Sequence, residues 1–148
     1  KEKAKQAGFT ESEIVTLASI VDEETDNEAE MPKIAGMYIN RLHLNMPLQA
    51  DPTVKFATKN FTAHRIYQKW LTIDNPYNTY KYRGLPPGPI RIPSVAAIDA
   101  VLNYVHHDYI YMCAKEDFSG THNFAKTYEE HQVNAAKYAK ALNERGIN

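Results

Sequence analysis

The sequence has a single cysteine, no surplus of basic residues and no long apolar run. One cysteine excludes an internal disulfide, so the redox compartment stays open. Lys and Arg number 17 against 18 Asp and Glu, and the net charge of -1 leaves nothing to neutralise a polyphosphate backbone. Nucleic acid is therefore not an expected partner. No stretch approaches the roughly 18 apolar residues of a membrane span, and no signal-peptide pattern opens the chain.

Motifs of several enzyme classes are also missing. The histidines show no His-x-x-x-His spacing and the lone Cys113 offers no thiolate cluster, so no metal site is expected. Neither a Gly-x-Ser-x-Gly elbow nor a phosphate-binding glycine loop is present, which disfavours serine hydrolases and nucleotide enzymes. Cys113 lies in the apolar run from Tyr109 to Ala114, where a small buried hydrophobe is favoured over a nucleophile.

What is present describes one globular domain. A chain of 148 residues with 43% hydrophobic and 24% charged residues can bury a core. Residues 1–8 have the pattern of the end of an upstream helix or linker, with Gly8 as its C-terminal stop. Residues 9–148 are expected to form the domain, and the full protein is expected to extend upstream.

Capping residues and apolar spacing predict mainly helices. Capping boxes start at Thr10 and at Thr127, and Asp51 before a proline and Ser94 are predicted N-caps. In the second helix the apolar residues share one face, while Lys33, Asn40 and Arg41 lie elsewhere around the axis. The expected helices run from Thr10 to the acidic stretch 22–26, from about Glu28 to Leu44, from Asp51 to about Thr58, from Ser94 to Val105 and from Thr127 to Arg145.

A hairpin and a long loop complete the predicted fold. Residues 108–114 form an apolar and aromatic strand, residues 115–121 supply a turn, and residues 122–125 return as a partner strand. Residues 60–93 are rich in Pro, Gly, Asn and Tyr without a sustained period, which predicts a long ordered loop. Helices with a small antiparallel sheet make the class α+β.

The acidic run Asp22-Glu23-Glu24 is the first candidate for chemistry. It ends an otherwise apolar helix, where the helix dipole disfavours negative charge. A carboxyl that is also shielded from water there would have a raised pKa and could act as an acid. Only one of the three needs to face inward. On these residues alone, a solvated acidic face is the stronger alternative.

The loop segments 75–80 and 84–90 are the second candidate. Prolines and glycines give them a stiff, specific shape, and they present tyrosines and an asparagine. Such a surface suits a sugar, whose apolar face stacks on aromatic rings while its hydroxyl and acetamido groups bond to Asn, Gln and Asp. The alternative is that these tyrosines and prolines only brace a long loop.

Three segments together resemble the YceG-like endolytic murein transglycosylases. Their order and spacing match as well, and the resemblance covers nearly the whole chain. The matching segments are Leu17–Thr25, Asn40–Leu42 with Leu48–Thr53, and Tyr77–Tyr80 with Gly84–Gly88, and the likeness continues through Gly120–Phe124 to His131.

The resemblance implies non-hydrolytic cleavage of the MurNAc-GlcNAc β-1,4 bond of peptidoglycan, which leaves 1,6-anhydro-MurNAc ends. It implies that Glu24, directly before Thr25, is the catalytic acid and base, with Asp22 disfavoured as the acid and Glu23 facing solvent. We expect Glu24 in a cleft with the Tyr77–Tyr80 loop opposite. The expected substrate-binding residues are Asn40, Gln49, Asp51, Tyr77, Asn78, Tyr80 and His122, and no cofactor or metal is implied.

Alternatives exist for the group that stabilises the charged centre and for the role of Asp51. An oxygen of Gln49 or Asn78, or the MurNAc acetamido group, could stabilise the oxocarbenium-like centre. Asp51 could serve only as the cap of its helix, and this reading is slightly favoured over substrate contact.

The resemblance also implies a place and partners. Family members carry an N-terminal membrane helix and a LysM-like module, so the expected location is the bacterial cytoplasmic membrane, single-pass, with this domain facing the periplasm or cell exterior. The expected partner is the peptidoglycan glycan strand, with membrane contact only through the upstream anchor. Docking to peptidoglycan synthases is compatible with catalysis.

Two other functions remain open on the sequence. A non-catalytic glycan-binding module would use the tyrosine and proline loop as a platform, and Glu24→Gln would then change nothing. An aminodeoxychorismate lyase would need a Schiff-base lysine for pyridoxal phosphate, and nothing in the sequence singles one out.

Overall fold

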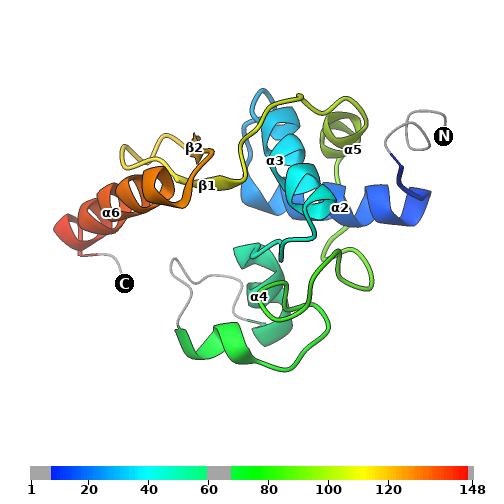
Figure 1. The fold of residues 1–148 in the computed structure, drawn as a ribbon, viewed down its shortest axis with the longest axis horizontal. Helices are drawn as coiled ribbons and strands as arrows, with labels where there is room; N and C mark the ends of the chain where they lie inside the picture. The colour runs from blue at the N-terminus through cyan, green and yellow to red at the C-terminus, as the bar shows by residue number, and fades with distance from the viewer. Residues whose placement is uncertain (1–7, 60–67, 147–148) are drawn as a thin grey trace.

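The computed structural model describes residues 8–59 and 68–146. The predicted end of an upstream helix over residues 1–7, and residues 60–67 of the predicted loop, lie outside the described residues. No helix in the described part of the chain is long and apolar enough to cross a membrane. The elements, in chain order, are α2 (Glu11–Glu24), α3 (Met31–His43), α4 (Asp51–Thr58), the 3-10 helix η1 (Gln68–Thr72), α5 (Val95–Leu102), β1 (Tyr111–Ala114), β2 (His122–Ala125) and α6 (Tyr128–Glu144) (Figure 1).

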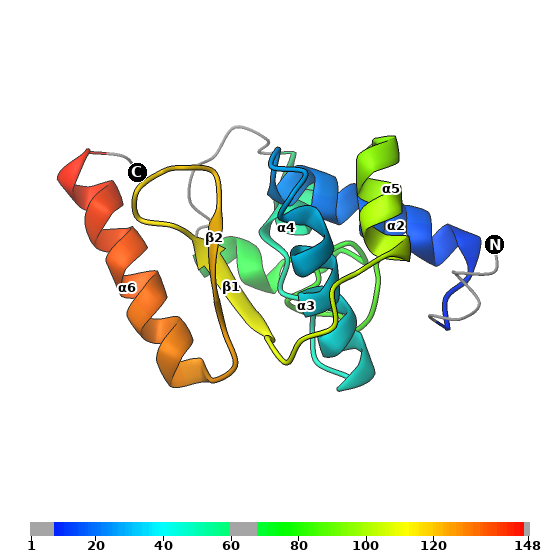
Figure 2. The same cartoon turned by 90° about the horizontal axis from the view of Figure 1, so that it is seen from above.

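Helices α2, α3 and α5 pack together and form the body of the molecule (Figure 2). Their facing stripes bury a continuous apolar core, and each large aliphatic side chain removed from water contributes about 1.5–3 kcal/mol. The predicted α+β class, with mainly helices and a small antiparallel sheet, is confirmed. The largest fully buried apolar side chains are Leu17, Ile20, Val21, Ile34, Tyr38, Ile39, Leu48, Val54 and Val101.

Most of the predicted caps are confirmed, and one is wrong. Thr10 forms the reciprocal capping box with Glu13, and Ser94 accepts a hydrogen bond from the backbone N–H of Ala97 at 3.1 Å. Thr127 also caps its helix, although no reciprocal bond to its backbone is formed. Asp51 is not a cap, because Ala50 occupies that position and has no side-chain cap hydrogen bond to the first turn of α4.

Two predicted helices are shorter than their apolar patterns indicate. Helix α3 begins at Met31 rather than Glu28, because residues 28–30 form turns. Helix α5 ends at Leu102 rather than Val105, and the backbone N–H of Val105 donates instead to the carbonyl of Pro32 at 3.1 Å. A contact with another helix therefore overrides the local periodicity.

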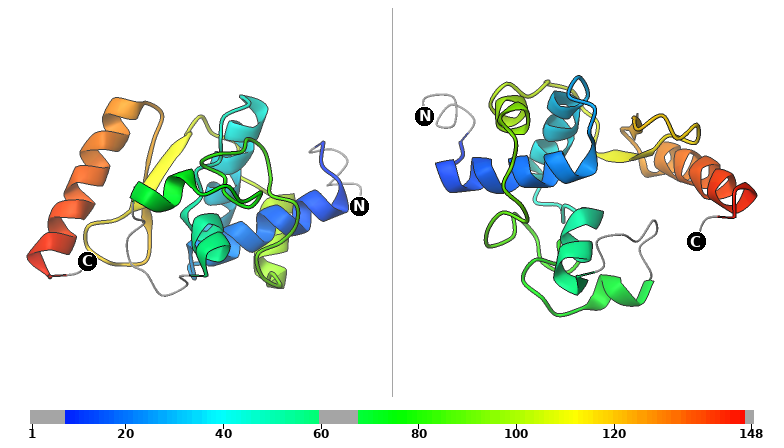
Figure 3. Two further views of the ribbon diagram at one scale, coloured as in Figure 1. Left: turned by 90° about the horizontal axis from the view of Figure 1, so that it is seen from below. Right: turned by 180° about the vertical axis from the view of Figure 1, so that it is seen from behind.

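Strands β1 and β2 pair antiparallel, and α6 packs against them to form an arm beside the body (Figure 3). The end of α3 holds the chain that leads into this arm. The Asn40 amide donates to the carbonyls of His107 and Tyr109 at 2.8 and 2.9 Å, and Arg41 Nε donates to that of Ile110 at 2.6 Å. The arm thus takes its position from backbone carbonyls bonded to two adjacent side chains.

Gly36 is the point where this chain crosses α3. A Cβ atom built at this position would lie 2.2 Å from the Val105 carbonyl oxygen and 2.9 Å from Nε2 of His107. A backbone oxygen cannot move aside as the end of a flexible side chain can. Only glycine therefore permits this close approach.

We expect Gly36→Ala to lower the free energy of unfolding by about 2–3 kcal/mol, because the added methyl group must displace the crossing chain. Urea denaturation measures this change. Gly88→Ala is the matched control, since its Cβ would meet only the Tyr77 hydroxyl at 3.4 Å and the cost should stay within about 0.5 kcal/mol. Equal stability of the two variants would contradict the assigned crossing.

Candidate active site

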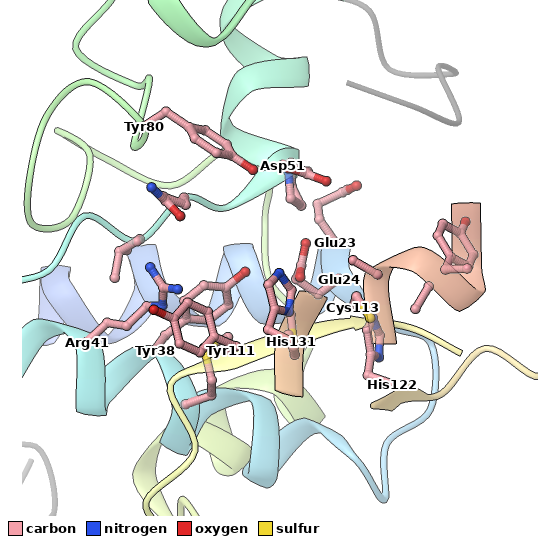
Figure 4. Close-up of a pocket in the computed structure, with 18 of the residues that line it drawn as sticks. Glu23, Glu24, Tyr38, Arg41, Asp51, Tyr80, Tyr111, Cys113, His122 and His131 are labelled. Carbon is pink, nitrogen blue, oxygen red and sulfur yellow. Dashed lines mark hydrogen bonds between the residues drawn. The ribbon is translucent and has the colours of Figure 1, made fainter. Parts of the chain in front are cut away.

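A cleft of about 360 Å³ lies between the body and the arm (Figure 4). Its volume falls in the range of small-molecule sites. Residues from α2, α3, the start of α4, the loop at residue 80, the hairpin and α6 all contribute to its lining. The lining includes Glu23, Glu24, Tyr38, Arg41, Gln49, Asp51, Lys55, Tyr80, Tyr111, Cys113, His122, His131 and Tyr138.

The three carboxyls of the acidic run have different surroundings. Asp22 accepts a hydrogen bond from the backbone N–H of Ser94 at 2.7 Å, which ties α2 to the start of α5. Glu23 is exposed, as predicted, and lies 3.1 Å from Nη1 of Arg91. Glu24 is half-buried in the cleft at the last residue of α2. The helix end thus separates a structural, a solvated and an enclosed carboxyl.

The enclosed position changes the acidity of Glu24. Burial and, next, the Asp51 carboxylate raise its pKa from 4.5 to about 8. A hydrogen bond from the Tyr38 hydroxyl and the charge of Lys55 favour the ionised form but are outweighed. Although part of the side chain reaches solvent, cleft walls surround the carboxyl and make desolvation the largest cause. Glu24 is therefore mainly protonated at neutral pH and is available as an acid.

Asp51 and Tyr80 form the wall near Glu24. The Tyr80 hydroxyl donates to Oδ1 of Asp51 at 2.6 Å. The cleft walls desolvate the Asp51 carboxyl and raise its pKa, although the residue keeps contact with solvent, while Tyr80 and Lys55 favour its charged form. Burial and Asp51 raise the pKa of Tyr80, so it remains a donor. This pair gives the cleft a second, fixed carboxyl.

Thr79 holds this wall in place. Its hydroxyl accepts from the backbone N–H of Ala50 at 2.9 Å and lies 2.8 Å from the hydroxyl of Thr53. Its carbonyl accepts from the backbone N–H of Gln49 at 3.2 Å. Gln49 has a φ of 50°, a conformation that costs a non-glycine residue about 1 kcal/mol. The contacts with Thr79 hold this strained residue at the cleft.

Five of the residues predicted for the site line the cleft, namely Glu24, Gln49, Asp51, Tyr80 and His122. Tyr80 supplies the predicted contribution of the 77–80 loop. His122 is also engaged inside the protein, because its Nδ1 lies 2.7 Å from Oε1 of Glu30 and its backbone N–H donates to Oε2 at 2.8 Å. This pair joins β2 to the start of α3 and limits what His122 can offer to a ligand.

The structure does not bring Asn40, Tyr77 and Asn78 into the cleft. Asn40 bonds the chain that enters the arm, as described above. Tyr77 packs on Phe56, with ring centroids 4.9 Å apart. Asn78 is fully buried, and its amide donates to the carbonyls of Leu71 and Ile73. These three side chains support the walls of the cleft rather than face it.

Sequence reasoning missed several cleft residues. Tyr38 belongs to the apolar face predicted for the second helix, and the feature that could have identified it is its hydroxyl, since a buried tyrosine needs a polar partner. Arg41 was placed away from the buried face, yet it is only 4% exposed. Tyr111 and His131 gave no signal by spacing, because they meet only when α6 packs on β1. Their rings stack with centroids 5.1 Å apart.

Cys113 differs from its prediction as a buried hydrophobe. It is half-buried and lines the cleft. Burial and the Glu116 carboxylate raise the pKa of its thiol to about 11, so a thiolate nucleophile is disfavoured at neutral pH. Within the described ranges, no group of three His, Cys, Asp or Glu side chains is arranged to hold a metal ion.

Comparison with known proteins gives consistent matches. Residues 1–137 match the model of the YceG-like family. The chain is 39% identical over 145 residues to an endolytic murein transglycosylase of Bacillus subtilis (strain 168), covering 98% of this chain and 39% of that protein. It is 33% identical over 141 residues to an endolytic murein transglycosylase of Streptococcus pneumoniae, covering 93% of this chain and 25% of that protein.

A solved structure is similar over most of the fold. The crystal structure of a yceG-like protein from Listeria monocytogenes superposes with a TM-score of 0.80 and 35% sequence identity. The match covers 89% of this chain and 42% of that one. The chain therefore spans less than half the length of each of these relatives.

Two substitutions should move the pKa of Glu24 in opposite directions. Asp51→Asn removes a neighbouring negative charge and should lower it below about 8. Tyr38→Phe removes a hydrogen bond to the ionised form and should raise it. NMR titration of the Glu24 side-chain carboxyl carbon measures both. If both substitutions shift the pKa of Glu24 in the same direction, or leave it unchanged, Asp51 and Tyr38 do not control that pKa.

Proposed function

Because the chain belongs to the YceG-like family, we propose that it is the catalytic part of an endolytic peptidoglycan lytic transglycosylase. The proposed reaction cleaves the MurNAc-GlcNAc β-1,4 bond without water and leaves a 1,6-anhydro-MurNAc end. The observation that carries this proposal is the position of Glu24 in a cleft of about 360 Å³, where burial raises the pKa of its carboxyl to about 8. The names of the two bacterial relatives support the same substrate.

One carboxyl is sufficient for this chemistry. Glu24 donates its proton to the bridging oxygen as the bond from that oxygen to C1 of MurNAc breaks, and GlcNAc leaves with a free hydroxyl. The C6 hydroxyl of the same MurNAc then bonds to C1, and the Glu24 carboxylate accepts its proton. The substrate supplies the nucleophile, so the second carboxylate of an ordinary glycosidase is not required. The enzyme ends the cycle protonated, as it began.

The wall formed by Asp51, Tyr80 and Gln49 suits the developing positive charge. An oxocarbenium-like centre is stabilised by fixed oxygen atoms with partial or full negative charge. Asp51 supplies a carboxylate held by Tyr80, and Gln49 supplies an amide oxygen from a strained, anchored backbone. We therefore assign substrate contact to Gln49, Asp51 and Tyr80. His122 is assigned to the edge of the site.

The setting of the whole protein follows from the same proposal. Action on murein places this domain in the cell envelope, on the periplasmic or outer face of the cytoplasmic membrane. The upstream membrane helix and LysM-like module implied by the resemblance would provide the anchor. Glycan strands are the proposed partner, and docking to peptidoglycan synthases would bring the cleft to strands as they are made.

Glu24→Gln should lower the rate of anhydro-end formation at least about 100-fold, because the amide cannot donate the first proton. Purified chain and variant are incubated with peptidoglycan sacculi, the product is digested with a muramidase, and 1,6-anhydro-MurNAc ends are counted by mass spectrometry. Glu23→Gln is the matched control, since it removes the adjacent, solvated carboxyl and should retain activity within about threefold.

Other outcomes of this experiment point elsewhere. Equal activity of the Glu24→Gln variant would remove Glu24 from the mechanism. If neither protein forms anhydro ends, the test is repeated on a chain with the upstream region restored. Retention of sacculi without any cleavage by that longer chain would favour a glycan-binding module.

The rate of anhydro-end formation should fall as pH rises through about 8. Glu24 must be protonated at the start of the cycle, and its raised pKa keeps the acid form populated up to that pH and depletes it above. A pH-rate profile on soluble glycan fragments measures this alkaline limb, and Asp51→Asn should move it to lower pH. An alkaline limb near pH 4–5 would contradict an enclosed acid.

A further inference from the structure

Arg41 is a buried cation at the cleft, and it has no carboxylate partner among the residues that the structure describes. Its side chain donates to the carbonyls of Ile110 and Pro47, both at 2.6 Å. Among the described residues, no other acceptor is bonded to the guanidinium, so some of its N–H groups are unused. A charge that is 4% exposed and has no counter-ion is unfavourable unless something neutralises it.

The side chains that act electrostatically on the guanidinium are tyrosines. Tyr38, Tyr80 and Tyr111 are the groups whose charge would favour that of Arg41. Burial raises the pKa of both Tyr38 and Tyr80, so these two hydroxyls stay neutral and cannot act as counter-ions. The Tyr111 ring packs on the guanidinium with 5.1 Å between its centroid and the Arg41 Cζ atom. The protein thus surrounds this cation with hydroxyls and an aromatic face.

His131 supplies a second, independent observation. Its Nδ1 is buried and has no hydrogen-bond partner within the described part of the chain. The ring stacks on Tyr111, with an interplanar angle of 19°. Burial and then Arg41 lower the pKa of His131, so its imidazole is neutral at pH 7 and adds no further positive charge. Figure 4 shows Arg41, Tyr38 and Tyr111 together, with His131 near them.

We propose that Arg41, with Tyr38, Tyr111 and His131, forms a subsite for a carboxylate group of the glycan substrate. A guanidinium binds a carboxylate through paired hydrogen bonds, and the Tyr111 hydroxyl can donate to the same oxygens. The ligand class is a saccharide bearing an acidic substituent, which distinguishes murein from neutral polymers of GlcNAc. This inference rests on the proposed function and adds a substrate requirement to it.

The position of Tyr38 sets where that carboxylate would lie. Its hydroxyl bonds to Glu24, and it is also among the groups that act on Arg41. The subsite is therefore adjacent to the acid, and the acidic substituent belongs on or next to the sugar whose bond is cleaved. Two sources have this chemistry: the lactyl carboxylate of MurNAc in strands without stems, and a carboxylate of the stem peptide.

The test measures binding rather than cleavage, by calorimetry on the Glu24→Gln form of the 148-residue chain. The ligands are a GlcNAc-MurNAc tetrasaccharide with free lactyl carboxylates, the same saccharide carrying tetrapeptide stems, and both with their carboxylates converted to methylamides. We expect an acidic ligand to bind about tenfold more tightly than its amide. Adding Arg41→Met should remove this difference, and adding Arg83→Met, which removes an exposed arginine outside the cleft, should leave it unchanged.

The two ligand pairs identify the source. A loss of affinity on amidating the stem-free saccharide assigns the subsite to the lactyl group, and a loss only on amidating the stems assigns it to the peptide. Equal binding of acid and amide in both pairs overturns the proposal. It is also overturned if Arg41→Met weakens the amide ligand as much as the acid, since Arg41 would then only support the fold.

Two further readouts keep the test decisive. If Arg41→Met does not fold, the comparison of acid and amide on the Glu24→Gln chain still decides, and Arg41→Lys, which retains the charge, should keep part of the preference. Bound carboxylate should raise the pKa of His131 in an NMR titration, which a purely structural arginine would not do. A carboxylate preference without any cleavage, either by the parent chain or by the chain with the upstream region restored, would reject the proposed reaction and retain the subsite.

Discussion

The site depends on the hydrogen bonds between the end of α3 and the chain segment that leads into the arm. Asn40 and Arg41 bond backbone carbonyls of residues 107–110, and these bonds place β1 and α6 across from α2 and α4. The cleft exists because the two parts are held apart at this fixed position. Its walls then exclude water from Glu24, and this exclusion is the main reason that its carboxyl holds a proton at neutral pH.

Charge is divided along the cleft. The Asp51 carboxylate near Glu24 adds to the effect of burial in raising the pKa of Glu24. Arg41 lies elsewhere on the lining among tyrosines and the neutral His131. Tyr38 links the two, because its hydroxyl bonds to Glu24 and it is also among the groups that act on Arg41. A substrate that carries an acidic group and reacts at a neutral glycosidic oxygen matches this division.

Local patterns predicted much of the fold, because caps and helical periods are set by neighbouring residues. The capping box at Thr10, the cap at Ser94 and the β1–β2 hairpin needed no distant contact. The cap assigned to Asp51 failed because α4 begins one residue earlier, with Ala50 at the cap, and the Asp51 carboxylate instead accepts from Tyr80, 29 residues away. Arg41 could not be placed by its helical position either, since its partners are the Pro47 carbonyl after α3 and the Ile110 carbonyl and Tyr111 ring at the start of the later hairpin.

The hydrogen bonds that hold the arm in place are made to backbone carbonyl oxygens, which every amino acid has. Arg41 bonds the carbonyl oxygens of Ile110 and Pro47, so the anchoring is indifferent to the side chains at those two positions. Evolution can therefore alter what the entry to β1 presents to a ligand while leaving the geometry of attachment intact. Because the position of the arm does not depend on those side chains, relatives of this domain could carry different residues on the cleft wall while the backbone arrangement stays the same.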